Sequence, residues 1–155
     1  MNKHHLRQEM IDILNQELEN AINAARQAHD AATHEQSKAE TQYDTLGLEN
    51  AYLAHGLSRR IDELTQSISV LKNWSIKDFA NDEEVYLGAL LTLVTQDVQQ
   101  SVIFLAPCGG GLIIDQHKVK VITPQTPLGQ ALLGREVEDE VTLNTQARFK
   151  IINLQ

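Results

Sequence analysis

The sequence predicts an α+β protein of two parts, an antiparallel helical hairpin followed by a small α+β domain. Two observations predict this division. Proline is absent before Pro107, and the first 79 residues contain only Gly47 and Gly56, whereas six more glycines follow from Gly88 onward. Apolar residues recur at every third or fourth position in the first part, and they gather into short β-favouring runs in the second part.

Two apolar stripes with helical spacing define the first part. Steps of three and four residues put each stripe on one helix face, and a single stripe per helix is satisfied by one partner helix. The stretch between the stripes, roughly Thr33 to Gly47, is polar and is predicted to be the link. We therefore expect a coiled-coil hairpin over residues 1–78, with its tip near 35–47, and a second domain over 79–155. The stripes comprise Leu6, Met10, Leu14, Leu18, Ala21, Ala25, Ala28 and Ala32, then Leu53, Leu57, Ile61, Leu64, Ile68, Leu71 and Trp74.

The second part is predicted to form strands and one short helix. Pro127 to Leu133 suits a helix because Thr126 can cap its start, proline fits the first turn and Gly134 can end it. The segment from Trp74 to Glu83 is the expected hinge. The strands, which we expect to form an antiparallel meander, are Glu84–Thr95, Gln99–Ala106, Leu112–Asp115, Lys118–Thr123, Val141–Leu143 and Arg148–Leu154.

The composition restricts the classes of function. The net charge is −8, from 13 basic and 21 acidic side chains, and it disfavours direct binding of nucleic acid, which requires a surplus of Lys and Arg. The single Cys108 excludes an internal disulfide and a multi-cysteine zinc site. No run reads as a signal peptide or as the roughly 20 apolar residues of a membrane helix. We expect a cytoplasmic protein without membrane contact, a monomer or weak dimer, with no cofactor of its own.

One segment of the second part resembles a known signature. Val121 to Val141 combines a β-strand, a Thr-Pro start to a short apolar helix that ends in Leu-Leu-Gly-Arg, and an acidic turn before a valine. This resembles the carboxyl-terminal motif of the Gre transcript-cleavage factors, and Phe149 to Ile152 resembles the closing strand of that family. The resemblance implies an amino-terminal helical hairpin followed by an FKBP-like α+β domain. This is also the order that the residue patterns predict.

The resemblance implies a partner and an activity. Gre factors bind bacterial RNA polymerase, with the globular domain at the rim of the secondary channel and the hairpin inside the channel. Acidic residues at the hairpin tip help to hold Mg²⁺ in the polymerase active site, and the polymerase then cleaves its own backtracked transcript. The chain would therefore stimulate an enzyme without being one. It would share the polymerase Mg²⁺, and it would meet nucleic acid only indirectly, within the elongation complex.

The tip motif of the family places Asp and Glu three residues apart, with Lys just before the Glu. Here Glu40 takes the Glu position if one residue of slippage after Lys38 is allowed, but Ser37 stands at the Asp position. Glu35 and Asp44 are the carboxylates that can compensate, since Glu40 and Asp44 share a face if the segment is helical. The alternative is that these carboxylates are solvated loop charges. A factor that occupies the channel without causing cleavage therefore stays open.

The polymerase-docking surface of the family includes a Ser-Pro-apolar sequence, which Thr126, Pro127 and Leu128 match. Gln125 stands where the family usually has Asp or Asn. The alternative is that these residues only begin a helix, with threonine as its cap.

In the family, basic residues on the hairpin can contact RNA. The residues that correspond here are Lys38, Arg59 and Arg60. The alternative is that they lie on solvated helix faces and pair with Asp62 or Glu63. Two other functions are alternatives: the FKBP-like second domain could be a prolyl isomerase, or the chain could be a coiled-coil chaperone. The isomerase is disfavoured because its sites are aromatic-lined and the second part contains few aromatic residues.

Overall fold

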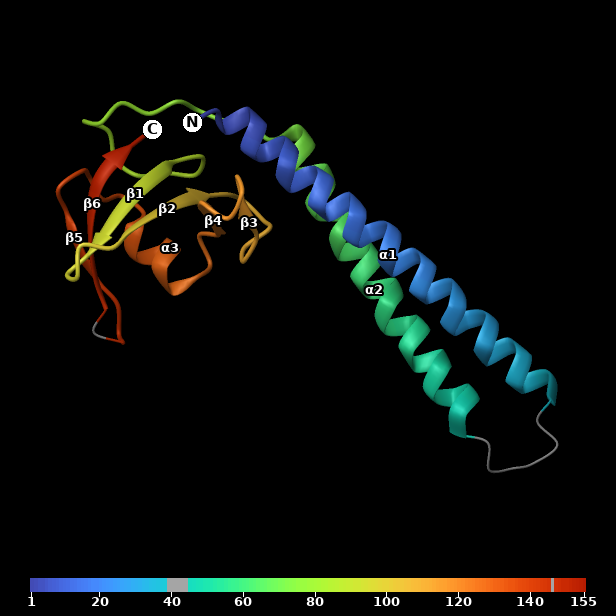
Figure 1. Cartoon of the computed structure of the whole chain (residues 1–155). Coiled ribbons are helices and arrows are strands. Elements are labelled where there is room, and N and C mark those ends of the chain that lie inside the picture. The colour runs from blue at the N-terminus through green and yellow to red at the C-terminus, as the bar shows by residue number, and fades with distance from the viewer. Residues whose placement is uncertain (39–44, 146) are drawn as a thin grey trace. The chain divides into compact units, whose positions relative to one another are not determined.

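The structure, a computed structural model, describes residues 1–38, 45–145 and 147–155, and it describes side chains for residues 1–34, 48–145 and 147–155. Two long helices precede a six-stranded sheet with one short helix, so the predicted α+β architecture is confirmed (Figure 1). None of the helices in these ranges is long and apolar enough to cross a membrane. The elements are α1 (Lys3–Lys38), α2 (Thr45–Asn73), β1 (Leu90–Thr95), β2 (Gln100–Leu105), β3 (Ile113–Ile114), β4 (Val119–Ile122), α3 (Pro127–Leu132), β5 (Glu140–Thr142) and β6 (Arg148–Leu154).

The chain divides into two compact units. Residues 12–69 form one, which we call the hairpin unit. Residues 1–11 and 70–155 form the other, which we call the sheet unit, so the start of α1 and the end of α2 belong to it.

In the hairpin unit, α1 and α2 pack along a regular seam. The buried or half-buried positions alternate steps of three and four residues, which is the spacing of an antiparallel coiled coil. Arg60 of α2 and Glu17 of α1 form an ion pair of 2.8 Å across the seam. The seam residues are Leu14, Leu18, Ala21, Ala25, Ala28 and Ala32 from α1, and Ala54, Leu57, Ile61, Leu64 and Ile68 from α2.

Leu53 was predicted to belong to this seam, and that prediction is wrong. Its side chain is 55% exposed, and Ala54 takes the inward position. The predicted link is also too long, because α1 continues to Lys38 and α2 already begins at Thr45. Thr33 to Lys38 contains neither Gly nor Pro, so polar residues can continue α1 there without an apolar face.

The sheet unit contains the expected strands, but their pairing differs from a meander. The strand order is β3-β4-β2-β1-β6-β5, and β2 and β4 are parallel, with Val102 beside Val119. The chain leaves β2, turns at residues 107–111, forms the two-residue β3 and returns through β4 between β3 and β2. The last strand, β6, lies between β1 and β5. Alternating apolar residues identify strands but do not encode which strands become neighbours.

Side chains on the two faces of the sheet have different partners. One face forms a core with α3, in which Leu132 packs with Leu91, Ile103 and Ile151. Phe104, adjacent in sequence to Ile103, points to the other face, and its ring centroid lies 5.6 Å from that of Trp74. The start of β1 is later than predicted, because Gly88 has a φ of +98° in a turn before it.

Candidate functional site

The segment with the Thr-Pro motif connects β4 to α3, and its hydrogen bonds form a helix cap. Thr126 Oγ1 accepts a hydrogen bond from the Gly129 backbone N–H at 3.1 Å, and it donates one to the Thr123 carbonyl at 2.8 Å. Pro127 occupies the first turn, where no backbone donor is needed. The expected cap and the proline position are therefore present as predicted.

The four predicted docking residues differ in how far their side chains are exposed to solvent. Gln125 and Pro127 are exposed, whereas Thr126 and Leu128 are half-buried. Leu128 packs against the core beneath α3, and the hydroxyl of Thr126 is used in the cap. Gln125 and Pro127 are therefore the two side chains that this segment offers to a partner, one amide and one apolar ring.

Gly129 fixes the shape of this segment, and the sequence reasoning did not single it out. A Cβ atom placed there would lie 2.1 Å from the Thr123 carbonyl oxygen, so any other residue would push β4 and α3 apart. Its φ is not in the left-handed region, so close packing and not backbone conformation requires the glycine. The sequence does contain one indication of this role: Gly129 lies three residues after the capping Thr126, in the turn where its N–H meets the cap.

The hairpin-tip candidates lie at or just beyond the end of α1 in the sequence. Glu40 and Asp44 lie outside the described residues, and Glu35 and Lys38 lie in α1 with side chains that are not described. Their proposed proximity to a metal therefore stays a prediction. Within the described ranges, no group of three or more His, Cys, Asp or Glu side chains is arranged to hold a metal ion.

The two arginines of α2 are both exposed, but they differ in their contacts. Arg60 pairs with Glu17 at 2.8 Å and with Glu63 at 3.7 Å. Arg59 has no ion pair with any residue that the structure describes. Of the two, Arg59 is therefore the arginine whose charge is not used in an ion pair among the described residues.

Sequence reasoning missed a group of charged side chains at the start of α1, which we call the α1 anchor and which consists of Lys3, Arg7 and Glu9. Each binds a backbone group elsewhere in the sheet unit. Lys3 Nζ donates to the carbonyls of Lys77 and Gly88, and the second bond measures 3.2 Å. The signal was available, because Lys3 lies three residues before Leu6 and so continues the apolar stripe with a charged residue.

Arg7 and Glu9 complete the α1 anchor. Arg7 donates to the Trp74 carbonyl at 2.7 Å. The Glu9 carboxylate accepts the Asp115 N–H with both oxygens, at 3.0 and 3.1 Å. Asp115 begins a turn in which three successive residues other than glycine have positive φ, at 51°, 54° and 72°. Glu9 thus holds a turn that is costly for side chains of the L configuration.

Replacing Glu9 with alanine should lower the free energy of unfolding by about 1–2 kcal/mol, because the Asp115 N–H loses a charged acceptor beside a strained turn. Native-state amide exchange is the sharpest readout. The Asp115 amide should exchange much faster in the variant, whereas the matched change Glu19→Ala, on the exposed side of α1, should leave it unchanged. An unaltered Asp115 exchange rate in Glu9→Ala would contradict this role.

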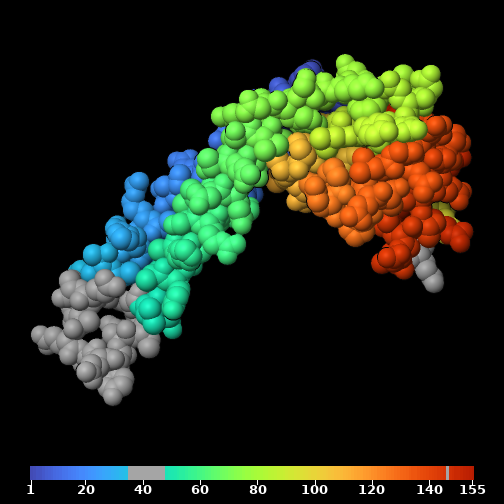
Figure 2. All heavy atoms as spheres, turned by 180° about the vertical axis from the view of Figure 1, so that it is seen from behind, coloured from blue at the N-terminus to red at the C-terminus, as the bar shows by residue number. Residues whose placement is uncertain are grey.

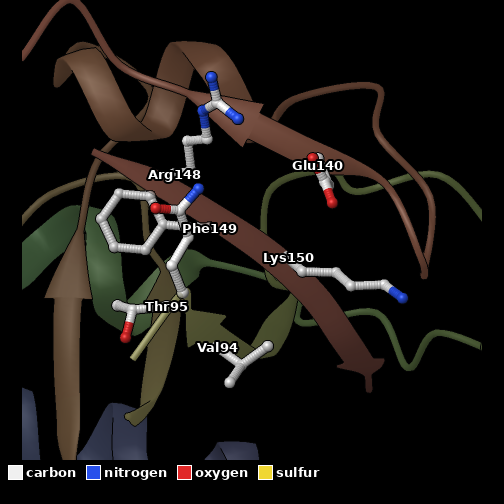
Figure 3. A pocket seen from close by; sticks show the side chains of 7 residues that line it. Val94, Thr95, Glu140, Arg148, Phe149 and Lys150 are labelled. Carbon is white, nitrogen blue, oxygen red and sulfur yellow. The ribbon is translucent and has the colours of Figure 1, made fainter. Parts of the chain in front are cut away.

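A shallow cavity of about 180 Å³ lies between β1, β5 and β6 (Figure 3). Phe149 is the one aromatic side chain among the described residues that line it, and none of the predicted site residues contributes. A hydrogen bond to Glu138 raises the pKa of Lys150 at its rim, so this lysine stays charged. The cavity does not have the aromatic lining that a proline site needs. Its lining residues are Val94, Thr95, Gln96, Glu140, Arg148, Phe149 and Lys150.

Comparison with known proteins gives structural matches only. No family model matches the chain, and no curated protein sequence matches it. Among solved structures, "GreA factor homolog 1 (Gfh1)" of Thermus thermophilus is 23% identical, with 94% of each chain covered and a TM-score of 0.41. "The transcription factor Gfh1" in a second structure is 22% identical over 95% of this chain and 94% of that chain, with a TM-score of 0.43. Gfh1 of Thermus aquaticus is 20% identical over 93% and 92%, with a TM-score of 0.42. All three are structures of a Gre-factor homologue.

Proposed function

We propose that this protein is a regulator of transcription elongation that binds bacterial RNA polymerase at its secondary channel, in the bacterial cytoplasm. One observation carries the proposal. The residues from Val121 to Val141 that resemble the Gre motif fold as the end of β4, a loop capped by Thr126, α3 and the start of β5. Gln125 in the loop and Pro127 at the start of α3 are exposed to solvent. The same chain supplies the helical hairpin that such a factor needs, in the expected order.

Binding is tested by co-purification with core polymerase and by competition with a known secondary-channel binder. Wild-type protein should bind, and the double change Gln125→Ala with Pro127→Ala should weaken binding about tenfold or more, since exposed contact residues can each contribute more than 1 kcal/mol. Gln130→Ala, on the exposed side of α3, is the matched control and should bind normally. Failure of the wild-type protein both to bind and to compete would refute the proposal.

Cleavage of the transcript is a separate question, and Ser37 makes it an open one. If the protein stimulates cleavage, changing Glu40 and Asp44 to alanine should abolish the stimulation and spare binding, because carboxylates are the oxygen ligands that Mg²⁺ prefers. A serine hydroxyl is a poor substitute for the carboxylate that the family places three residues before the Glu. Binding without stimulated cleavage by the wild-type protein would therefore favour a channel-occupying regulator, with nucleic acid met only through the polymerase.

A further inference from the structure

A glycine-rich turn is fixed to the end of β4. Residues 107–111, which we call the glycine turn, lie between β2 and β3 in the sequence. At the end of the turn, the Gly111 N–H donates a hydrogen bond to the Val121 carbonyl at 2.9 Å. Just before the turn, the Ala106 N–H donates to the Ile122 carbonyl, also at 2.9 Å. Both ends of the glycine turn are therefore bonded to the last residues of β4.

The start of α1 supports the middle of the glycine turn. A Cβ atom placed at Gly109 would lie 2.9 Å from Met10 Cε and 3.2 Å from Leu112 Cδ1, so these side chains lie close against the turn. Met10 is fully buried and belongs to the sheet unit, as the turn does. The glycine turn has little room to move, because β4 holds its ends and Met10 packs against its middle.

Within the turn, Gly110 lies against Thr123, the first residue after β4. A Cβ atom placed at Gly110 would lie 3.1 Å from Thr123 Cγ2, which is closer than nine in ten Cβ contacts in proteins. Gly110 is exposed and its φ is not in the left-handed region, so backbone conformation does not require a glycine there. Among the described residues, the close contact with Thr123 is the remaining physical reason for the glycine.

Thr123 in turn determines where the following loop begins. Its carbonyl oxygen accepts hydrogen bonds from the Thr126 hydroxyl at 2.8 Å and from the Thr126 N–H at 3.1 Å. Residues 123–127, which we call the docking loop, carry the exposed Gln125 and Pro127. In Figure 2 the orange segment that contains this loop and α3 lies on the surface of the sheet unit. A displacement of Thr123 would therefore displace the two exposed side chains.

We propose that Thr123, held by the glycine turn, is a positioning residue that sets the geometry in which Gln125 and Pro127 meet RNA polymerase. This proposal rests on the proposed function and adds to it the contact that shapes the docking loop. A methyl group at Gly110 would displace Thr123 by a few tenths of an ångström, because the turn cannot retreat and the χ1 angle of threonine is restricted. Binding groups must be held within about 0.5 Å of their productive geometry, so a shift of this size should lower the affinity.

Gly110→Ala separates positioning from folding. Alanine suits the φ at this position and restricts the unfolded chain, which offsets the closer contact, so the thermal midpoint should stay within about 3 °C of the wild type. In NMR spectra of the free protein, the amide signals of Thr126 and Gly129 should shift, because their hydrogen bonds form the cap. The affinity for immobilised core polymerase should fall about fivefold.

Three backgrounds show whether the loss acts through Thr123 and the docking loop. In Thr123→Ser, which lacks Cγ2 and keeps the hydroxyl, adding Gly110→Ala should cost less than about twofold. In the double variant Gln125→Ala with Pro127→Ala it should also cost less than about twofold, because the side chains that it displaces are already missing. Thr142→Ser, the same change on the exposed edge strand β5, is the matched control, and there Gly110→Ala should still cost about fivefold.

The outcomes separate this inference from the proposed function. Wild-type binding that Gly110→Ala leaves unchanged would overturn the positioning role and leave the proposed function intact. A fivefold loss that persists in Thr123→Ser would also overturn it, since the loss would not act through the Thr123 methyl group. A fall of more than about 10 °C in the thermal midpoint would assign Gly110 to folding instead. Failure of the wild-type protein to bind would refute the proposed function and the docking role together, whether or not the amide signals shift.

Discussion

Gly129→Ala is expected to lower the free energy of unfolding of the sheet unit by about 3 kcal/mol or more. The added Cβ would lie 2.1 Å from the backbone oxygen of Thr123, and a backbone atom cannot turn away as a flexible side chain can. Either β4 or α3 must move. The Thr126 cap, which depends on the Gly129 N–H, would be lost with that movement.

Tryptophan fluorescence measures this effect selectively. Trp74 is the one tryptophan in the sequence, and its ring lies against Phe104 in the sheet unit. Denaturant titrations followed at Trp74 should show a lower midpoint for Gly129→Ala, while Gln130→Ala, the next residue on the exposed side of α3, should stay within about 0.5 kcal/mol of the wild type. A loss below about 1 kcal/mol in Gly129→Ala would show that the loop can relax and that the close packing is not required.

Lys3→Met is expected to cost about 2 kcal/mol, because it removes a donor from two carbonyls that keep no other described partner for that bond. The side chain is 5% exposed and its amine also lies 5.0 Å from the centre of the Phe79 ring. Methionine keeps most of the volume, so the loss reports hydrogen bonding more than packing. Lys72→Met, an exposed lysine in the last turn of α2, is the control and should change stability little.

The pH dependence gives a second readout for Lys3. Burial of the ammonium lowers the pKa of Lys3, and the neighbouring Asp78 opposes this only in part. Between the lowered folded pKa and the unfolded value near ~10.4, the unfolded chain binds more protons, so the contribution of Lys3 to stability rises with pH. The difference in unfolding free energy between the wild type and Lys3→Met should therefore be larger near ~pH 10 than near ~pH 7. A difference that shrinks over this interval would contradict a buried, desolvated ammonium.

The sequence predicted the helices and the strands well because their signals are local. Alternating steps of three and four residues predicted both helices, and all six strands fall within or near their predicted ranges. Pairing is not local, and so the meander was wrong: nothing in the alternation of β4 indicates that it lies parallel to β2. The prediction for Leu53 was wrong for a related reason, since the side chain that enters the seam depends on how the two helices pack, and here it is Ala54.

The candidate site was predictable to a similar extent. The cap at Thr126 follows from residue types alone, and the structure contains it. The division between exposed Gln125 and Pro127 and half-buried Leu128 depends on how α3 packs, which no spacing in the segment reveals. The place of Lys3 in the apolar stripe could have indicated a buried lysine, but the partners of Lys3, Arg7 and Glu9 are backbone groups, which residue types do not reveal.

The position of β6 has a consequence for the order in which the protein forms during synthesis. β1 pairs with β6 across more than 50 residues of sequence, with Leu91 beside Leu154. The hairpin unit needs only contacts among residues already made, so it can fold early on the ribosome, whereas the sheet lacks the strand between β1 and β5 until β6 emerges. The first turns of α1, which are the first to be synthesised, bind backbone groups as far along the chain as Asp115, so they must wait for most of the sheet unit before all of their partners exist.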